Sequence, residues 1–105
     1  MIFDLRTYTL HPGRLPAWLK MYEQYGHPTQ VKHCGEPVFY ATSEVGTLNQ
    51  VVHVWQYKSQ AEREKRRNAL MIDPLFQDYL RRSAEMGAHL TQESRILKST
   101  SFSPL

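Results

Sequence analysis

The chain lacks the features that mark secreted or membrane-inserted proteins. It has 105 residues and one cysteine, Cys34, so it can form no internal disulfide. No apolar run approaches the roughly 20 residues that span a bilayer. Residues 1–6 also lack the basic-then-apolar layout of a secretory signal. We therefore expect a soluble, cytoplasmic protein that is not inserted in a membrane.

The sequence also lacks the motifs of the common cofactor and metal classes. It contains no glycine-rich phosphate loop and no dinucleotide fingerprint. Its histidines show no pair at a familiar metal-ligand spacing. The net charge is +3, and acidic residues are interspersed among the 13 lysines and arginines, which predicts a solvated surface rather than a basic stripe. We expect no metal site, no cofactor and no nucleic-acid partner.

Hydrophobic patterning predicts a single α+β domain over residues 1–105, with residues 99–105 as a flexible tail. Strands are expected at residues 2–10, 37–44, 48–58 and 88–98. A helix is expected over residues 15–25, interrupted at residues 26–28, with a short extension through His33. The order is βαββαβ, which is typical of a ferredoxin-like, four-stranded antiparallel sheet with two helices on one face.

Local signals predict where the second helical stretch begins, breaks and ends. Ser59 and Glu62 have the spacing of a capping box, in which each side chain satisfies a free backbone N–H at the helix start. Asp73 precedes a proline, so the helix should break there and a new one should start with Asp73 as its cap. Gly87 should end this second piece.

Strand alternation divides the residues of the third strand between two faces. We expect Val52 and Val54 to pack under the helices. The opposite face then presents an imidazole, an indole and a phenol, joined by an arginine and a tyrosine of the first strand. We call this set the polar-aromatic cluster: Arg6, Tyr8, His53, Trp55 and Tyr57. A patch of this kind is not expected to remain bare, so we predict a homodimer in which two sheets enclose a cavity.

The polar-aromatic cluster has two interpretations, which the sequence leaves open. In one, it lines a pocket for a small unsaturated or aromatic acid, and the protein is a binding protein, a cofactor-free acid/base enzyme or an oxygenase. In the other, it is the core of a dimer interface in a non-catalytic scaffold protein. A buried guanidinium needs an anion, which favours the pocket.

The pocket interpretation assigns roles to individual residues. His53 is the candidate acid or base, because imidazole titrates near pH 6.5, and Arg6 is the candidate for stabilising negative charge on a substrate. The remaining candidates are ligand-binding residues: Asp4, Tyr8, Glu44, Asn49, Trp55 and Tyr57.

Several segments together resemble the NIPSNAP family. Residues 4–13 resemble its opening strand and Pro-Gly turn, and residues 44–57 are similar to its most distinctive motif. Residues 63–67, 73–74 and 92–94 resemble its second helix and final strand. The resemblance implies a dimeric α+β barrel, a superfamily that includes cofactor-free oxygenases, isomerases, cyclases and some haem enzymes. It implies no particular reaction for this chain.

Overall fold

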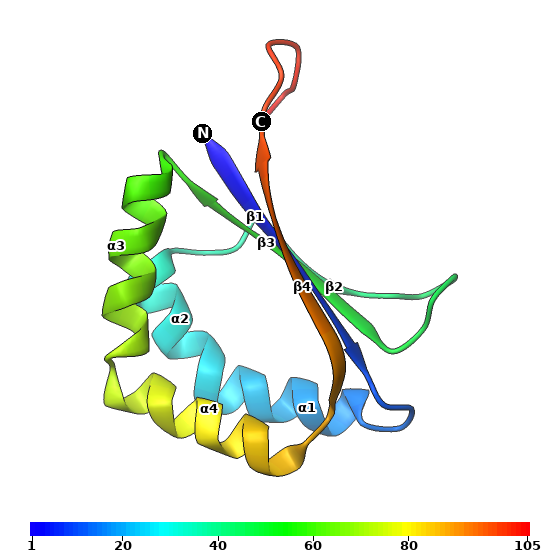
Figure 1. Ribbon diagram of the computed structural model, residues 1–105. Helices are drawn as coiled ribbons and strands as arrows, with labels where there is room; N and C mark the ends of the chain where they lie inside the picture. The colour runs from blue at the N-terminus through cyan, green and yellow to red at the C-terminus, as the bar shows by residue number, and fades with distance from the viewer.

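The protein is described here by a computed structural model that covers every residue, 1–105. It consists of one four-stranded sheet and one layer of helices (Figure 1). The elements, in chain order, are β1 (Ile2–Leu10), α1 (Leu15–Met21), the π-helical turn η1 (Tyr22–Gly26), α2 (His27–Cys34), β2 (Phe39–Thr42), β3 (Gln50–Tyr57), α3 (Gln60–Met71), α4 (Pro74–Met86) and β4 (His89–Lys98).

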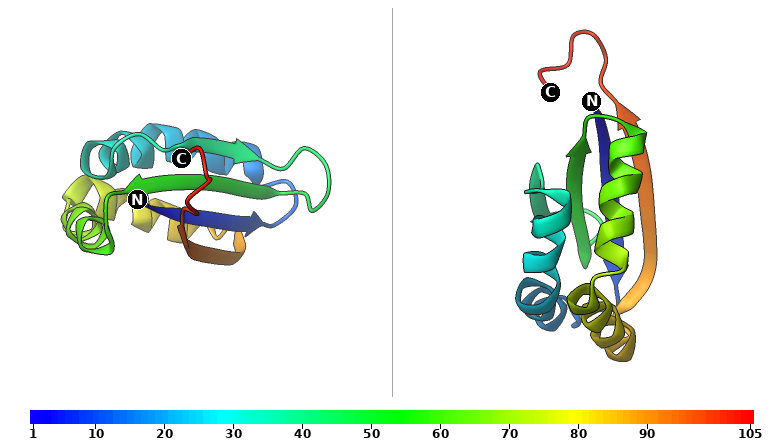
Figure 2. Two further views of the ribbon diagram at one scale, coloured as in Figure 1. Left: turned by 90° about the horizontal axis from the view of Figure 1, so that it is seen from above. Right: turned by 90° about the vertical axis from the view of Figure 1, so that its left-hand side faces the viewer.

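The sheet has the strand order β2-β3-β1-β4, and all neighbouring strands are antiparallel. The predicted ferredoxin-like α+β fold is confirmed, including the central pairing of the first and third strands. In the β1–β3 register Arg6 lies opposite His53, and Tyr8 lies opposite Val51. Two perpendicular views show that all the helices lie on one side of the sheet (Figure 2).

The predicted helix boundaries in the second half of the chain are confirmed. The Ser59 side chain accepts a hydrogen bond from the backbone N–H of Glu62, at 3.1 Å. Asp73 caps α4 by accepting a hydrogen bond from the backbone N–H of Leu75, at 2.9 Å. Gly87 follows α4 in the left-handed conformation, with φ of 59°, which costs glycine little.

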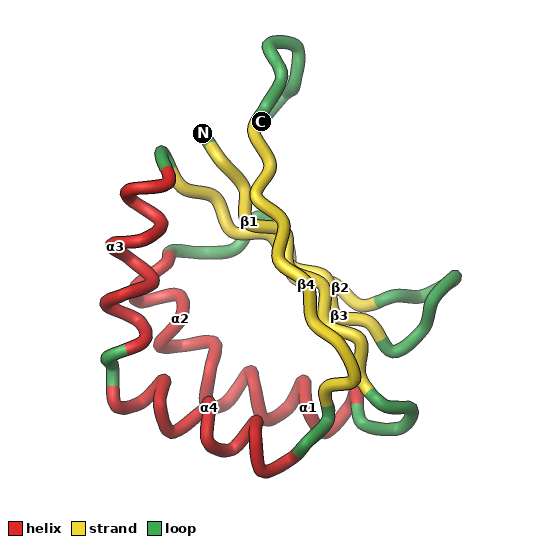
Figure 3. The backbone as a smooth tube through the Cα atoms, viewed as in Figure 1, coloured by secondary structure: helices red, strands yellow, loops and turns green.

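The first helical stretch differs from its prediction, because the chain does not break at His27 and Pro28. It continues from α1 into α2 through η1, where the backbone N–H of His27 bonds to the carbonyl of Tyr22, five residues earlier. Proline has no N–H to give to the preceding turn, and a π-turn is a way for a helix to pass such a position. The smooth tube in Figure 3 shows the resulting continuous path.

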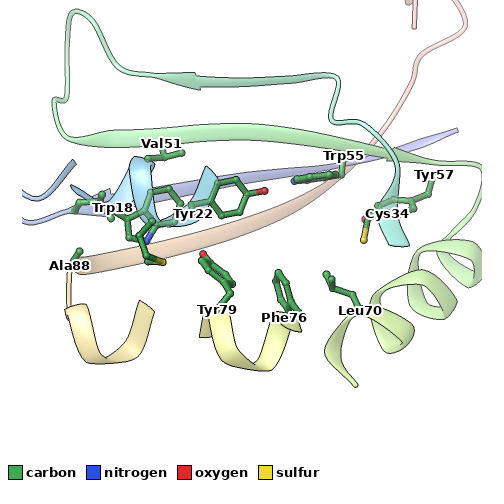
Figure 4. Close-up of a cluster of buried hydrophobic side chains, with 12 residues drawn as sticks. Trp18, Tyr22, Cys34, Val51, Trp55, Tyr57, Leu70, Phe76, Tyr79 and Ala88 are labelled. Carbon is green, nitrogen blue, oxygen red and sulfur yellow. The ribbon is translucent and has the colours of Figure 1, made fainter. Parts of the chain in front are cut away.

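The predicted assignment of the two sheet faces is wrong. His53, Trp55 and Tyr57 lie under the helices and are almost fully buried, with exposed fractions of 1%, 1% and 2%. Figure 4 shows Trp55 and Tyr57 on the side of β3 that faces α3 and α4. Large rings bury more apolar area than valines do, and the helices facing them also carry aromatic side chains, such as Tyr79.

The opposite, helix-free face mixes apolar and polar residues. On β1 and β3 it carries Phe3, Leu5, Val52 and Val54 together with Thr7, Thr9, Gln50 and Gln56, since Leu5 pairs with Val54 and alternates with buried Asp4. None of the four apolar residues belongs to the core cluster beneath the helices. No helix in the protein has the length and apolar character needed to cross a bilayer.

Candidate functional site

A cavity of about 130 Å³ lies between the sheet and the helices. All four strands contribute to its wall, together with η1, α2, α3 and α4. The polar lining residues on which the chemistry of the cavity depends are Arg6, Tyr8, Tyr40, His53, Arg67 and His89. An engineered apolar cavity of about 150 Å³ holds benzene, so this space suits a ligand of similar size.

The ionised groups that line the cavity are both cations. Arg6 projects from β1 and Arg67 from α3, and no aspartate or glutamate is among the lining residues. Arg67 makes no ion pair, whereas its neighbour Arg66 pairs with Glu62 at 3.0 Å. The lining therefore favours an anion, and Arg67 has a free charge to offer it.

Asp4 lies behind the cavity wall and neutralises part of this charge. Its carboxylate is fully buried and accepts hydrogen bonds from Arg6 at 3.3 Å, from Arg63 at 3.0 Å and from Ser94 at 2.6 Å. Burial opposes its ionisation, but the hydrogen bond from Ser94 and the two guanidinium groups outweigh burial and lower the pKa of Asp4. Asp4 thus joins β1, α3 and β4 and is not itself available to a ligand.

His53 is held in one protonation and tautomeric state. The indole N–H of Trp55 donates to Nδ1 of His53 at 2.7 Å. Because an indole can only donate, Nδ1 must be the acceptor and the ring proton must be on Nε2. Burial and the nearby charge of Arg6 lower the pKa of His53 to about 3. At neutral pH His53 is therefore an N–H donor and not a base.

The Nε2–H group of His53 is buried and has no hydrogen-bond partner within the protein, and the same holds for the hydroxyl of Tyr40. The two rings stack at 4.3 Å between centroids, and Tyr22 stacks on the far side of Tyr40 at 4.9 Å. Burial raises the pKa of Tyr40 and of Tyr22 far above neutral. Both phenols stay protonated. The Tyr22 hydroxyl donates to Gln30 at 2.8 Å, so the buried donors of the cavity wall that are left without an acceptor are those of His53 and Tyr40.

Three of the residues proposed from sequence come together at the cavity, namely Arg6, Tyr8 and His53. Asp4 and Trp55 lie behind them as hydrogen-bond partners. Tyr57 lies near Cys34, away from the cavity and against a separate surface hollow.

Glu44 and Asn49 belong to the loop between β2 and β3 and line none of the pockets. This loop extends away from the helices (Figure 3). Asn49 has a positive φ of 61°, and its carbonyl accepts a hydrogen bond from the backbone of Leu10 at 2.8 Å. Its position is explained by the turn, because asparagine tolerates this conformation.

Of the six polar lining residues on which the chemistry depends, three were not proposed from sequence: Tyr40, Arg67 and His89. Tyr40 could have been found from hairpin pairing, which sets it opposite His53. Arg67 follows from helix periodicity, since it lies one helical turn after Arg63 on α3. His89 begins β4 next to a register shift against β1, and no sequence signal points to it.

His89 differs from His53 in having no hydrogen bond that fixes its tautomer. Its ring packs edge-on against Tyr8 at 5.0 Å and Trp18 at 5.6 Å. Burial lowers its pKa, so its imidazole is neutral at pH 7. It also borders a second, outer hollow beside Gly87, which connects it to solvent.

The fold and the site define a ferredoxin-like α+β protein with a small, cationic, donor-rich cavity beneath its helices. The sequence profile described as NIPSNAP matches residues 3–104. A NipSnap homologue from Dictyostelium discoideum is 36% identical over 75 residues, which is 71% of this chain and 33% of the relative. The chain belongs to the NIPSNAP family, and it spans about a third of the length of the curated relatives it matches.

Solved structures agree with this assignment. A NIPSNAP family protein of unknown function from Agrobacterium tumefaciens has a TM-score of 0.91 and 39% identity, covering 100% of this chain and 93% of that one. A putative antibiotic biosynthesis monooxygenase from Nitrosomonas europaea has a TM-score of 0.67 at 9% identity, covering 94% and 98%. The second likeness shows a shared fold and nothing further.

Proposed function

We propose that the protein binds a small organic acid in the cavity between its sheet and its helices. The observation that carries the proposal is the composition of the cavity lining, which has two guanidinium groups and no carboxylate. Arg67 is the group that would hold the ligand carboxylate, because it is not engaged in an ion pair. The aromatic wall around Tyr40 and His53 suits a flat, unsaturated carbon skeleton.

The proposal is tested by titrating the protein with crotonate, a four-carbon unsaturated acid that fits the cavity volume. Binding is followed by calorimetry and by shifts of backbone amide NMR signals. We expect crotonate to shift the signals of Tyr40, His53 and Arg67, and n-butylamine, a cation of similar size, to leave them unchanged. Equal effects of the acid and the amine would contradict an anion site.

A matched pair of variants separates the cavity cation from its neighbour. Arg67→Gln removes a guanidinium that lines the cavity, and Arg66→Gln removes the adjacent one, which pairs with Glu62 on the surface of α3. Loss of a charge-assisted contact should weaken crotonate binding about tenfold in Arg67→Gln. Arg66→Gln should bind as the unaltered protein does, and a comparable loss in both variants would contradict the assigned role.

The protein is further proposed to work as a homodimer that closes over the helix-free sheet face. The support is the apolar character of that face at Phe3, Leu5, Val52 and Val54, together with the absence of any helix over it (Figure 2). A charge placed at its centre by Val52→Glu should convert the dimer to a monomer in analytical ultracentrifugation. A protein that is already monomeric at micromolar concentration would contradict this part.

The oxygenase alternative rests on fold likeness alone, and fold does not carry activity with it. The cavity chemistry points instead to hydrogen-bond donation and proton transfer. Its neutral imidazoles and protonated phenols can hold an oxygen atom and move a proton.

A further inference from the structure

Two neutral histidines line the same cavity and differ in their hydrogen bonding. His53 has its acceptor nitrogen occupied by Trp55, at 2.7 Å, so the nitrogen left for other partners carries a proton. His89 has no hydrogen bond to another side chain, and either of its nitrogens can accept a proton. The Tyr8 ring contacts both, with centroid distances of 4.9 Å to His53 and 5.0 Å to His89.

We propose that His53 and His89 act as a fixed donor and a base that together enolise a small 2-oxo acid bound in the cavity. This inference rests on the proposed acid-binding function and adds a carbonyl to the ligand. Trp55 is a positioning residue in this scheme, since it acts through His53 by fixing its tautomer.

The arrangement assigns each functional group of such a ligand to one part of the wall. The carboxylate meets Arg67, which has no other ion pair. The ketone oxygen accepts the hydrogen bond of His53 Nε2–H, a buried donor with no partner inside the protein. A neutral imidazole N–H can polarise a carbonyl in this way without giving up its proton.

The chemical step is a proton transfer from carbon to His89. A ring nitrogen of His89 takes a proton from the carbon next to the ketone. The electron pair of that C–H bond becomes the carbon–carbon double bond of the enolate, and the π electron pair of the ketone moves onto its oxygen. The ketone oxygen takes the negative charge, which His53 stabilises. Return of a proton from His89 to the same carbon restores the ketone, so no other reactant is consumed.

The location of His89 suits a base that must exchange its proton with water. It lies at the boundary between the cavity and the outer hollow that Ser83, Gly87 and Gln92 also border. His53 has no such route, because it is covered by Tyr40 and 99% of its surface is buried. The roles therefore cannot be interchanged.

Solvent exchange tests the step directly. The protein is mixed with 2-oxobutyrate in D₂O, and loss of the C3 methylene signal is followed by proton NMR. We expect exchange above the background rate, and a loss of about a hundredfold or more of that acceleration in His89→Gln. His11→Gln, at an exposed histidine outside the cavity, is the control and should exchange normally.

The tautomer is tested without any variant, by long-range proton–nitrogen NMR of the histidine rings. His53 should show the Nε2–H form at pH 7, and a charged or Nδ1–H ring would overturn the inference. In Trp55→Phe the fixed tautomer should be lost and exchange should slow, provided that the amide spectrum shows a folded protein.

The exchange and binding results together separate this inference from the one on which it rests. The protein could bind crotonate through Arg67 while 2-oxobutyrate exchanges no faster than it does without protein. That result would overturn enolisation and leave the binding function standing. Exchange that does not depend on His89 would overturn its role as the base. Failure of both acids to bind would remove the acid-binding function itself.

Discussion

The carboxylate of Asp4 on β1 accepts a hydrogen bond from Nε of Arg63 on α3, at 3.0 Å, across 59 residues of sequence. This contact joins the central strand to the helical layer at a site where Asp4 is fully buried. Arg6, which lines the cavity, shares the same carboxylate. The position of Arg6 therefore depends on a carboxylate that the ligand does not touch.

Asp4→Asn should destabilise the fold. The change leaves Arg6 and Arg63 without their counter-charge in a largely buried place, and breaking such a pair is costly. Because both arginines retain some access to water, we expect a loss of about 2 kcal/mol in the free energy of unfolding, measured by urea denaturation. Glu93→Gln, on the neighbouring strand and exposed, is the control and should change it by less than about 0.5 kcal/mol. Equal losses of stability in the two variants would contradict the role of Asp4 in joining β1, α3 and β4.

The stabilisation from Asp4 should depend on pH. The folded pKa of Asp4 is lowered, so the folded state holds its proton less tightly than the unfolded chain does. Its contribution is therefore present above the unfolded pKa of about 3.9 and is lost as pH falls through the folded value. The difference in unfolding free energy between the unaltered protein and Asp4→Asn should be constant from pH 7 to about 5 and shrink below 4. A difference in unfolding free energy that grows as the pH falls would contradict a lowered pKa of Asp4.

Gly26→Ala should disturb the packing of η1 against α4. An added Cβ would lie 2.8 Å from a ring carbon of Tyr22 and 2.9 Å from one of Tyr79, closer than carbon atoms approach. Overpacking of this kind costs about 1–3 kcal/mol, which thermal unfolding would show as a lower Tm. Gln24→Ala, exposed in the same turn, should change the Tm little, and a stabilised Gly26→Ala variant would show that the rings can move aside.

Cys34 should be unreactive in the folded protein. It is 3% exposed, and burial raises the pKa of its thiol, so little thiolate is present and none is accessible. With a disulfide reagent of the nitrobenzoate type, we expect labelling at least about a hundredfold slower in buffer than in urea. Rapid labelling under native conditions would mean that the C-terminal end of α2 opens readily.

Local chemistry predicted most of the fold, because turns and caps are decided by neighbouring residues. Ser59, Asp73 and Gly87 each act on backbone groups within a few positions, so their effects can be seen in the sequence alone. The π-turn before Pro28 escaped prediction, since a single proline is compatible with either a break or a shifted helix.

The grouping of the strand residues of the site was predicted, but the sheet face on which they lie was not. Alternation correctly grouped Arg6 and Tyr8 with His53, but it cannot say which group faces the helices. The hydrophobicity of Val54 led us to predict that its face packs under the helices, whereas the helices pack against the face with the larger rings. Asp4 was the clue to the opposite arrangement, because α3 supplies Arg63 to pair with it.

The extra residue of η1 changes the direction in which the side chains that follow it point. In a regular α-helix each residue turns by about 100°, so residues eight apart would point about 80° away from one another. The π-turn adds one residue to this path, and across it the hydroxyl of Tyr22 donates to the Gln30 side chain at 2.8 Å. Both residues line the cavity, so a one-residue deletion within η1 should separate them and change the shape of the cavity wall.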